Sequence, residues 1–456
     1  MRLGLYVSRH AGGRGGMATY SYALAEYLAG CAGSETELEL VVYGDQEFFT
    51  HCPELVSSWH HLVIDSPSSD RPVSYRILPD YFGRRVGYLF DQLVLPYWLR
   101  RDNVDVVYGS ANFTSIFSRL PKVVTIHDLF QGWPPVASRG SSASHLNSMC
   151  HEDSLSDSAS RAGVAGTTLL SFRKALKKVF QYCYRLAFRW QARRAKVIAD
   201  SPDAAKEIAE RLGCRDVSTI PLGLDRVFSR YFEREESRQA LFQGMKDWRE
   251  RRGVPVGSVL VLASSDPRKN LSGIIATLKA KLPDAVTVVA LDEKAAEKVR
   301  RSVPIFVEDQ ENYRLIKPLP REEVPFLFAS ARVLLLPTLA EGFGLPVVEA
   351  LAAGTSVVAG DFPHLRDAVT LKGDKLSQRW FSCAAQNSDD IGRALSLALR
   401  ATEPLMDETD YEFLKNKGAF CYPVRSMNEA AAAVLEICRT TACLDGVRRG
   451  ASRGAR

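Results

Sequence analysis

The chain has 456 residues, of which 46% are hydrophobic and 25% charged, and its formal net charge is +6. This length exceeds one ordinary hydrophobic core, so we expect two domains, and the composition is that of a soluble globular protein. The sequence contains no bilayer-spanning apolar run and no secretion signal, and the nine cysteines lack paired or zinc-ligand spacing. We therefore expect a cytoplasmic protein with reduced thiols and no metal site.

Strand and helix patterns alternate along the chain. Strands are predicted from apolar runs at 2–8, 38–44, 104–109 and 122–128, and later at 258–264, 285–291 and 331–337. Helices are predicted at 18–30, ending at Gly30, in the charged surface segment 226–252, and at 426–442. Such alternation implies parallel sheets with helices on both faces. We expect an α/β protein with two doubly wound domains that join near 221–225.

A glycine-rich loop, AGGRGGMA at 11–18, follows the first predicted strand and opens the first helix. Gly13, Gly15 and Ala18 fit the dinucleotide fingerprint G-x-G-x-x-A, which also requires an acidic residue about 20 positions later. The imperfect candidates for that residue are Glu35, Glu37 and Asp45. Two other interpretations stay open: the backbone approaches a substrate diphosphate, or the glycines only form a tight turn.

Polar side chains follow two further predicted strands. His127 and Asp128 end the run at 122–128, where the imidazole either binds a substrate hydroxyl or is satisfied by the backbone. In SSDPRKNL at 264–271, Arg268 and Lys269 precede a helix that the next residue, an asparagine, can cap. Two cations there suit phosphate binding, although exposed basic pairs are usually only solvated.

The most informative segment is AEGFGLPVVEALAAG at 340–354, directly after an apolar run. Glu341 precedes a glycine turn, Glu349 lies inside the following helix, Pro346 suits the first helical position, and Gly354 suits the residue past the last turn. Backbone amides at a helix start attract anions, and a strand, turn and helix in this order place ligands at the carboxyl end of a parallel sheet. The segment favours a donor with a diphosphate and many hydroxyls, such as a nucleotide sugar. The alternative is an ordinary turn with both glutamates solvated.

Two segments lack such a motif. Residues 137–168 are dense in Ser, Ala and Gly and predict a mobile loop, either a lid or a disordered insertion. Residues 171–196 mix Arg and Lys with aromatic residues and Leu, which fits peripheral contact with an anionic membrane or a helix whose apolar stripe packs on the domain. We expect no nucleic-acid partner, because no recognised binding motif accompanies the charge.

Taken together, these residues resemble the family 4 retaining glycosyltransferases of GT-B fold, over most of the chain. The resemblance is carried by EGFGLPVVEALAAG (341–354), TIHDL (125–129), DSPDAAKEIAERLG (200–213), TIPLGLD (219–225), PRKNL (267–271), DFPHLRDAV (361–369) and SMNEAAAAVLE (426–436). The chain departs from the family pattern at four positions. Ala263 and Ser264 replace a common Gly-Arg, Ala18 replaces a frequent glycine, and Asp367 replaces a usual glutamate.

The resemblance implies two Rossmann-like domains that face each other across a cleft. The two domains are an acceptor-side domain at 1–222 and a nucleotide-sugar donor domain at 223–425. A C-terminal helix at 426–445 would cross back to the first domain. The implied catalytic residues are His127 and Glu341, next to the transferred sugar, and Lys269, next to the departing diphosphate. The other implied donor contacts are Glu349, for the ribose hydroxyls, Arg268, Phe343, Gly344, Leu345, Gly15 and Gly16.

The activity implied by the resemblance is transfer of a hexosyl group, preferably mannosyl, from a nucleotide diphosphate sugar to a glycan or lipid-linked acceptor in polysaccharide biosynthesis. The resemblance implies no cofactor and no metal ion, since cations and amides stabilise the leaving diphosphate. Two alternatives stay open. One is an NAD-dependent oxidoreductase built on the loop at 11–18, and the other is an inactive nucleotide-sugar-binding or membrane-associated protein, cytoplasmic or at the inner face of the membrane.

Overall fold

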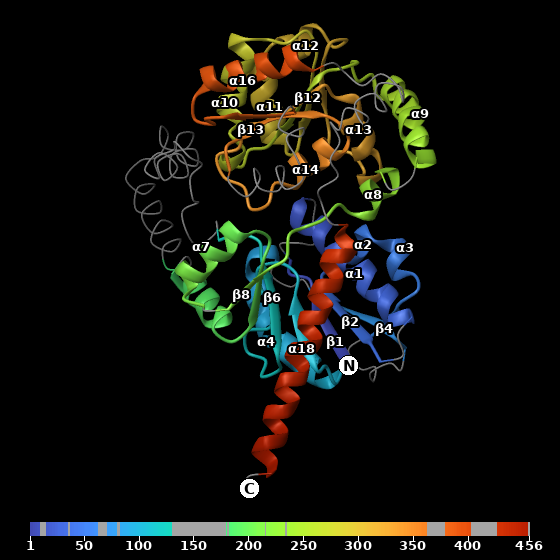
Figure 1. Ribbon diagram of the computed structural model, residues 1–456, viewed down its shortest axis with the longest axis vertical. Helices are drawn as coiled ribbons and strands as arrows, with labels where there is room; N and C mark the ends of the chain where they lie inside the picture. Colours follow the sequence, from blue (N-terminus) through green and yellow to red (C-terminus); the bar gives the residue numbers. More distant parts are fainter. Residues whose placement is uncertain are drawn as a thin grey trace. The chain divides into compact units, whose positions relative to one another are not determined.

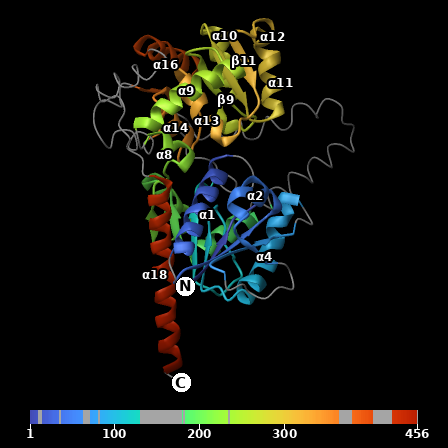
Figure 2. The same ribbon diagram turned by 90° about the vertical axis from the view of Figure 1, so that its right-hand side faces the viewer.

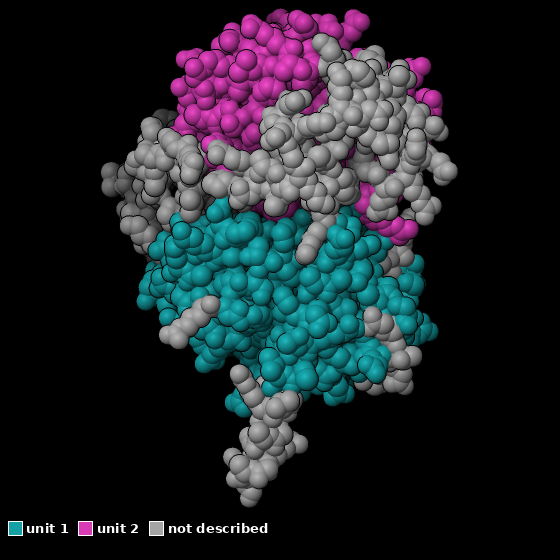
Figure 3. Space-filling model, viewed as in Figure 1, with its two compact units in different colours: residues 1–133, 172–225, 425–456 teal, residues 134–171, 226–424 magenta. Residues whose placement is uncertain are grey.

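A computed structural model of the chain describes residues 1–9, 15–34, 37–62, 71–79, 83–129, 179, 182–214, 216–232, 235–362, 379–402 and 426–454. Several predictions lie outside these residues: Gly13, Glu35, the serine-rich segment 137–168, most of 361–369 with Asp367, and the beginning of 171–196. The described residues form two compact units, which Figure 3 colours separately. Those of unit 1 lie in Met1–Trp133, Phe172–Asp225 and Arg425–Arg456, and those of unit 2 in Arg226–Val424.

Unit 1 is built on a parallel sheet with the strand order β3-β4-β2-β1-β5-β6-β7-β8. Its strands are β1 (Arg2–Tyr6), β2 (Glu39–Gly44), β3 (His60–His61), β4 (Val73–Ile77), β5 (Val106–Gly109), β6 (Lys122–Ile126), β7 (Lys196–Ala199) and β8 (Val217–Thr219). The chain extends from β1 through β2 to one edge, and from β5 through β6 to the other (Figure 1). The carboxyl ends of β1 and β5 therefore form a topological switch point, where doubly wound sheets bind ligands.

The helices of unit 1 come from both ends of the chain. They are α1 (Gly16–Ser34), α2 (Gln46–His51), α3 (Pro53–Val56), α4 (Gly83–Arg101), α7 (Pro202–Leu212) and α18 (Met427–Gly454), and residues 182–192 are also helical. The predicted end of the first helix at Gly30 is wrong, because α1 continues to Ser34 and buries Ala32. Figures 1 and 2 show α18 lying along α1, and it also packs on β5 and β6. The last helix thus completes the first unit.

Unit 2 has a second parallel sheet, with the strand order β11-β10-β9-β12-β13-β14. Its strands are β9 (Val259–Ala263), β10 (Val286–Ala290), β11 (Tyr313–Ile316), β12 (Val333–Leu336), β13 (Ser356–Gly360) and β14 (Trp380–Cys383). The chain extends to one edge from β9 and to the other from β12, and these two strands are neighbours. The switch point of unit 2 therefore lies at the carboxyl ends of β9 and β12.

The helices of unit 2 follow the strands in alternation. They are α8 (Arg226–Phe232), α9 (Glu235–Arg252), η2 (Pro267–Lys269), α10 (Leu271–Ala280), α11 (Glu293–Ser302), α12 (Ile305–Glu308), η3 (Arg321–Glu323), α13 (Val324–Ser330), α14 (Leu345–Ala352) and α16 (Ser388–Ala401). The described residues of the charged segment 226–252 are helical as predicted, in α8 and α9, but they are more than a surface element. α9 packs on α13 and buries Leu241, Met245 and Trp248.

Candidate functional site

Two loops meet at the switch point of unit 2. The loop after β9 contains η2, and the loop after β12 leads to α14. The backbone N–H of Leu339 donates to the Arg268 carbonyl at 2.7 Å, and Asn270 Nδ2 donates to the Pro337 carbonyl at 3.0 Å. Asn270 also caps α10 through Gly273 N–H at 3.2 Å and adopts a left-handed φ of 54°. These bonds fix the two loops against each other.

Lys269 and Glu341 form an ion pair across these loops. The Lys269 Nζ lies 2.7 Å from Glu341 Oε1, and the side chains are 23% and 10% exposed. Because both groups are largely removed from water, their mutual attraction is stronger than that of a surface pair. The sequence indicated Lys269 and Glu341 as candidate site residues in two separate segments. The fold brings the two side chains into contact.

Arg268 is paired within its own loop. Its guanidinium donates to both carboxylate oxygens of Asp266, with Nη2 2.6 Å from Oδ2. Burial raises the pKa of Asp266, but the hydrogen bonds and charge of Arg268 lower it by more, so the net pKa lies below its ordinary value. Part of the positive charge of Arg268 is therefore already balanced, and Lys269 is the nearer cation to Glu341.

The family-typical Gly-Arg positions have a different chemistry here. Ala263 is the last residue of β9, and Ser264 Oγ donates to Asp292 Oδ2 at 3.2 Å. Asp292 also accepts from the backbone N–H of Ser265 at 2.7 Å and caps α11. Burial raises the pKa of Asp292, yet these hydrogen bonds outweigh it and lower the pKa overall. This position holds an acidic cap instead of a guanidinium.

The start of α14 presents backbone without a capping side chain. Gly344 is the N-cap with a φ of 84°, a left-handed conformation that favours glycine, and it has no side chain to make a capping hydrogen bond. Leu345 opens the helix, so Pro346 occupies the second helical position rather than the predicted first. Phe343 and Leu345 are both buried beside the turn. A helix start of this kind suits an anion.

Glu349 is 5% exposed, which contradicts a solvated side chain. Its Oε1 pairs with Arg321 Nη2, and the Arg321 guanidinium lies 4.8 Å from the centre of the Phe228 ring. The short helix η3 that carries Arg321 is held by Glu323, which accepts from Trp248 Nε1 at 2.6 Å. Sequence reasoning missed Arg321, because one arginine in a charged run carries no motif.

Three polar groups lie at the ends of neighbouring strands in unit 1. His127 follows β6, and its Nδ1 is 2.7 Å from Asp200 Oδ2, beyond β7. Its Nε2 is 2.9 Å from the carbonyl oxygen of Ser110, which follows β5. Burial lowers the pKa of His127, but the charge and hydrogen bond of Asp200 and the Ser110 carbonyl raise it by more. Sequence reasoning found His127 and missed its partner Asp200.

The glycine loop of unit 1 is described only at its end. Gly15 has a φ of 123°, which only glycine adopts readily, and its carbonyl accepts from Thr19 in the first turn of α1, which begins at Gly16. Asp45, one acidic candidate for a ribose contact, instead caps α2 by accepting from Phe48 N–H at 2.9 Å. This second role weakens the dinucleotide interpretation.

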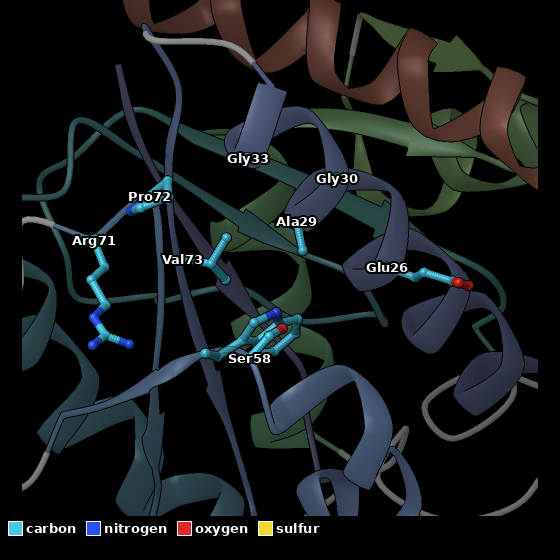
Figure 4. Close-up of a pocket in the computed structure, with 9 residues that line it drawn as sticks. Glu26, Ala29, Gly30, Gly33, Ser58, Arg71, Pro72 and Val73 are labelled. Carbon is cyan, nitrogen blue, oxygen red and sulfur yellow. The ribbon is translucent and has the colours of Figure 1, made fainter.

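Unit 1 also contains a pocket of about 390 Å³, away from these residues. It lies at the end of α1 and the beginning of β4, and its lining includes Gly30, Trp59 and Val73. Figure 4 shows the charged side chains of Glu26 and Arg71 on opposite sides of the pocket rather than converging in it. It occupies the amino end of the strands, whereas the sites above occupy the carboxyl ends.

Two family models match the chain in succession. Residues 14–228 match the model described as Glycosyltransferase Family 4, and residues 248–408 match the model described as Glycosyl transferases group 1. The chain belongs to the family 4, group 1 glycosyltransferases. Its two units have the Rossmann-like architecture of GT-B enzymes. Membership in this family does not favour the oxidoreductase alternative.

Curated relatives of this glycosyltransferase match over short stretches. The O-antigen chain mannosyltransferase B of Escherichia coli is 26% identical over 125 residues, covering 25% of this chain and 31% of that protein. The MMP alpha-(1->4)-mannosyltransferase of Mycolicibacterium hassiacum is 46% identical over 56 residues, covering 12% and 14%. The matched region thus spans less than half the length of these curated relatives.

Solved structures match this glycosyltransferase over nearly its whole length. Anabaena Alr3699/HepE in complex with UDP and glucose aligns with a TM-score of 0.58 and 14% identity, covering 96% of this chain and 100% of that one. WaaG, a glycosyltransferase involved in lipopolysaccharide biosynthesis, aligns with a TM-score of 0.56 and 15% identity, covering 96% and 99%. At these identities the likeness supports the fold alone.

Proposed function

We propose that this glycosyltransferase moves a hexosyl group from a nucleotide diphosphate sugar to a glycan or lipid-linked acceptor, with retention of the anomeric configuration. The observation that carries the proposal is the grouping of Lys269, Glu341, Glu349 and the α14 start around the β9–β12 switch point of unit 2. A cation and a helix start suit a diphosphate, and two carboxylates suit hydroxyl groups.

Each residue has a distinct part in the proposed reaction. Lys269 and the amides near Gly344 stabilise the negative charge that grows on the diphosphate as the sugar leaves. Arg268, which is paired with Asp266 as Lys269 is paired with Glu341, adds a second cation from the same loop. Glu349 accepts from the ribose hydroxyls, and Glu341 contacts the transferred sugar. This set of groups needs neither a metal ion nor a cofactor in the proposed mechanism.

The proposed donor sugar is mannose, and the proposed setting is polysaccharide biosynthesis. The support is the activity named for the relatives, which include two O-antigen chain mannosyltransferases and the Mycolicibacterium hassiacum mannosyltransferase above. A UDP-glucose complex of a structural neighbour supports a nucleotide sugar as the donor class. The donor screen below identifies the nucleotide base.

The proposal is tested by donor screening. Purified protein is incubated with GDP- and UDP-linked hexoses and with NADH, and thermal shift identifies the ligand that raises the melting temperature. Release of nucleotide diphosphate from that donor, with and without a lipid-linked oligosaccharide, then measures transfer. Stabilisation by a nucleotide sugar with turnover supports the proposal. Binding without turnover supports the inactive alternative, and stabilisation by NADH alone overturns the proposal.

We also propose that the helix at 182–192, together with Val179 and Arg193, touches an anionic membrane from one side. Tyr184 and Phe188 pack on Phe113, with the Phe113–Phe188 ring centres 4.4 Å apart, so one face belongs to the core. The opposite stripe exposes Val179, Tyr182, Leu186, Arg189 and Arg193. Apolar and cationic side chains on one stripe favour an interfacial contact. In the described part of the chain, no helix is long and apolar enough to cross a bilayer.

Vesicle flotation tests this contact. The variant Arg189→Glu with Arg193→Glu is expected to lose binding to vesicles rich in phosphatidylglycerol, because about 1 kcal/mol of attraction is lost per basic residue near the surface. The control, Lys294→Glu with Lys298→Glu on exposed positions of α11, changes the same charge in unit 2. Equal flotation of both variants and the unmodified protein contradicts the proposal.

A further inference from the structure

His127 lies between two acceptors at the carboxyl end of the unit 1 sheet. β6 is flanked by β5 and β7, so His127 has Ser110 on one side and Asp200 on the other. The imidazole is 5% exposed and Asp200 is 1% exposed. The backbone N–H of His127 also donates to Asn112 Oδ1 at 2.8 Å, which holds the residue in place.

The hydrogen-bond partners define the protonation of the imidazole. A carbonyl oxygen accepts only, and so does an ionised carboxylate. Both ring nitrogens must then donate, which only the imidazolium form does. The competing arrangement puts the proton on Asp200 and leaves a neutral imidazole. Although burial lowers the pKa of His127, the charge and hydrogen bond of Asp200 help to raise it above its ordinary value, which favours the proton on the ring.

The surrounding groups agree with a charged imidazole. Among the described residues, the titratable groups that face it are Asp200 beyond β7, Asp128 next in the chain, and Tyr20 from α1, whose ring meets the imidazole edge-on at 4.9 Å. Asp200 Oδ1 is buried and has no hydrogen-bond partner in the described part of the chain. A buried carboxylate with one unsatisfied oxygen depends on a nearby cation, and His127 supplies it.

We propose that His127 is an imidazolium at neutral pH whose charge contributes to turnover, and that Asp200 is the positioning residue that keeps it charged. The contribution to turnover rests on the proposed function, whereas the charge of the imidazole does not.

The charge is tested by NMR of ¹⁵N-histidine-labelled full-length protein, with His127→Gln to assign the signal. We expect both ring nitrogens of His127 to be protonated at pH 7.5. In Asp200→Asn the amide satisfies a neutral ring, so the pKa of His127 falls by at least about one pH unit. The control Asp128→Asn removes a nearby charge but leaves the hydrogen bond between His127 and Asp200 in place. The pKa of His127 should therefore fall less than in Asp200→Asn. A neutral His127 in the unmodified protein, or an unchanged pKa in Asp200→Asn, overturns the proposal.

The contribution of the charge to turnover is tested by the pH dependence of kcat/KM. The raised pKa means that the charged form is present at low pH and is lost as pH rises through that pKa. In Asp200→Asn this loss occurs at lower pH, so the ratio of unmodified to variant kcat/KM rises about tenfold per unit of pKa change. A ratio independent of pH indicates a merely structural Asp200 and overturns this part. Absence of all turnover contradicts the proposed function, and the NMR result still decides the charge.

Discussion

Lys269 is bound to Glu341 in the structure and is proposed to stabilise a diphosphate during the reaction. These roles are compatible because the Nζ atom carries three donors, and the bond to Glu341 Oε1 at 2.7 Å uses one of them. Glu341 then holds the ammonium in place without removing its remaining donors. The pair keeps the ammonium donors of Lys269 preorganised at the end of two fixed loops.

Replacing Lys269 by Ala is expected to slow transfer about 100-fold, because one preorganised donor to the developing charge is lost. Single-turnover measurements at saturating donor separate this effect from weaker binding. Lys279→Ala removes an exposed lysine from α10, in the same unit, and serves as the control. Wild-type turnover in Lys269→Ala means that the lysine has no part in the chemistry.

Glu349→Gln is expected to weaken binding of the nucleotide diphosphate roughly 10- to 100-fold, because hydrogen bonds to a charged group contribute about 1.5–3 kcal/mol. The substitution also removes the carboxylate partner of Arg321, so Arg321→Ala is expected to weaken binding in the same direction. Calorimetric titration measures both. The neighbouring exposed Glu322→Gln should bind normally, and an equal loss there points to a general charge effect.

At the level of secondary structure, the loop between β9 and α10 depends on Asn270. This residue is 6% exposed, adopts a left-handed φ of 54°, caps α10 and bonds to the carbonyls of Pro337 and Ala385. One side chain therefore ties η2 to the loop that carries Glu341. The geometry of the candidate site follows from this link.

Asn270→Ala is expected to lower the free energy of unfolding by at least about 2 kcal/mol, since several hydrogen bonds of about 1 kcal/mol each are lost. Alanine adds about 1–2 kcal/mol of strain in the left-handed region, which Asn270→Gly avoids. Urea unfolding of both variants measures the two contributions. If the glycine variant is no more stable than the alanine variant, the backbone conformation contributes nothing.

At the level of the whole chain, α18 belongs to unit 1 although it follows unit 2 in the sequence. It buries Ala430, Val434 and Cys438, and it packs on α1, β5 and β6. Deleting residues 427–456 uncovers these apolar surfaces, so we expect loss of cooperative unfolding of unit 1 or insolubility. Deleting only 445–456 removes none of the buried side chains described on α18, and the melting temperature should be nearly unchanged. Equal stability of both truncations contradicts this role.

The sequence by itself predicts the α/β class, most of the central strands and the segment with Glu341 and Glu349, since apolar runs, glycines and helix starts are local signals. It also indicated His127, which lies at the end of a predicted buried strand, and Lys269, which precedes a predicted helix. These signals are local, because the apolar periodicity of a strand or helix and the residues at its ends can be read from neighbouring positions in the chain.

The tertiary structure alone decided the partners. Asp200 beside His127, Arg321 beside Glu349 and Glu341 beside Lys269 are set by strand order and loop contact. It also decided that α1 continues past Gly30, because burial of Ala32 outweighs the weak helix preference of one glycine. Contacts between residues far apart in sequence follow from how the sheet is ordered, and no local pattern encodes that order.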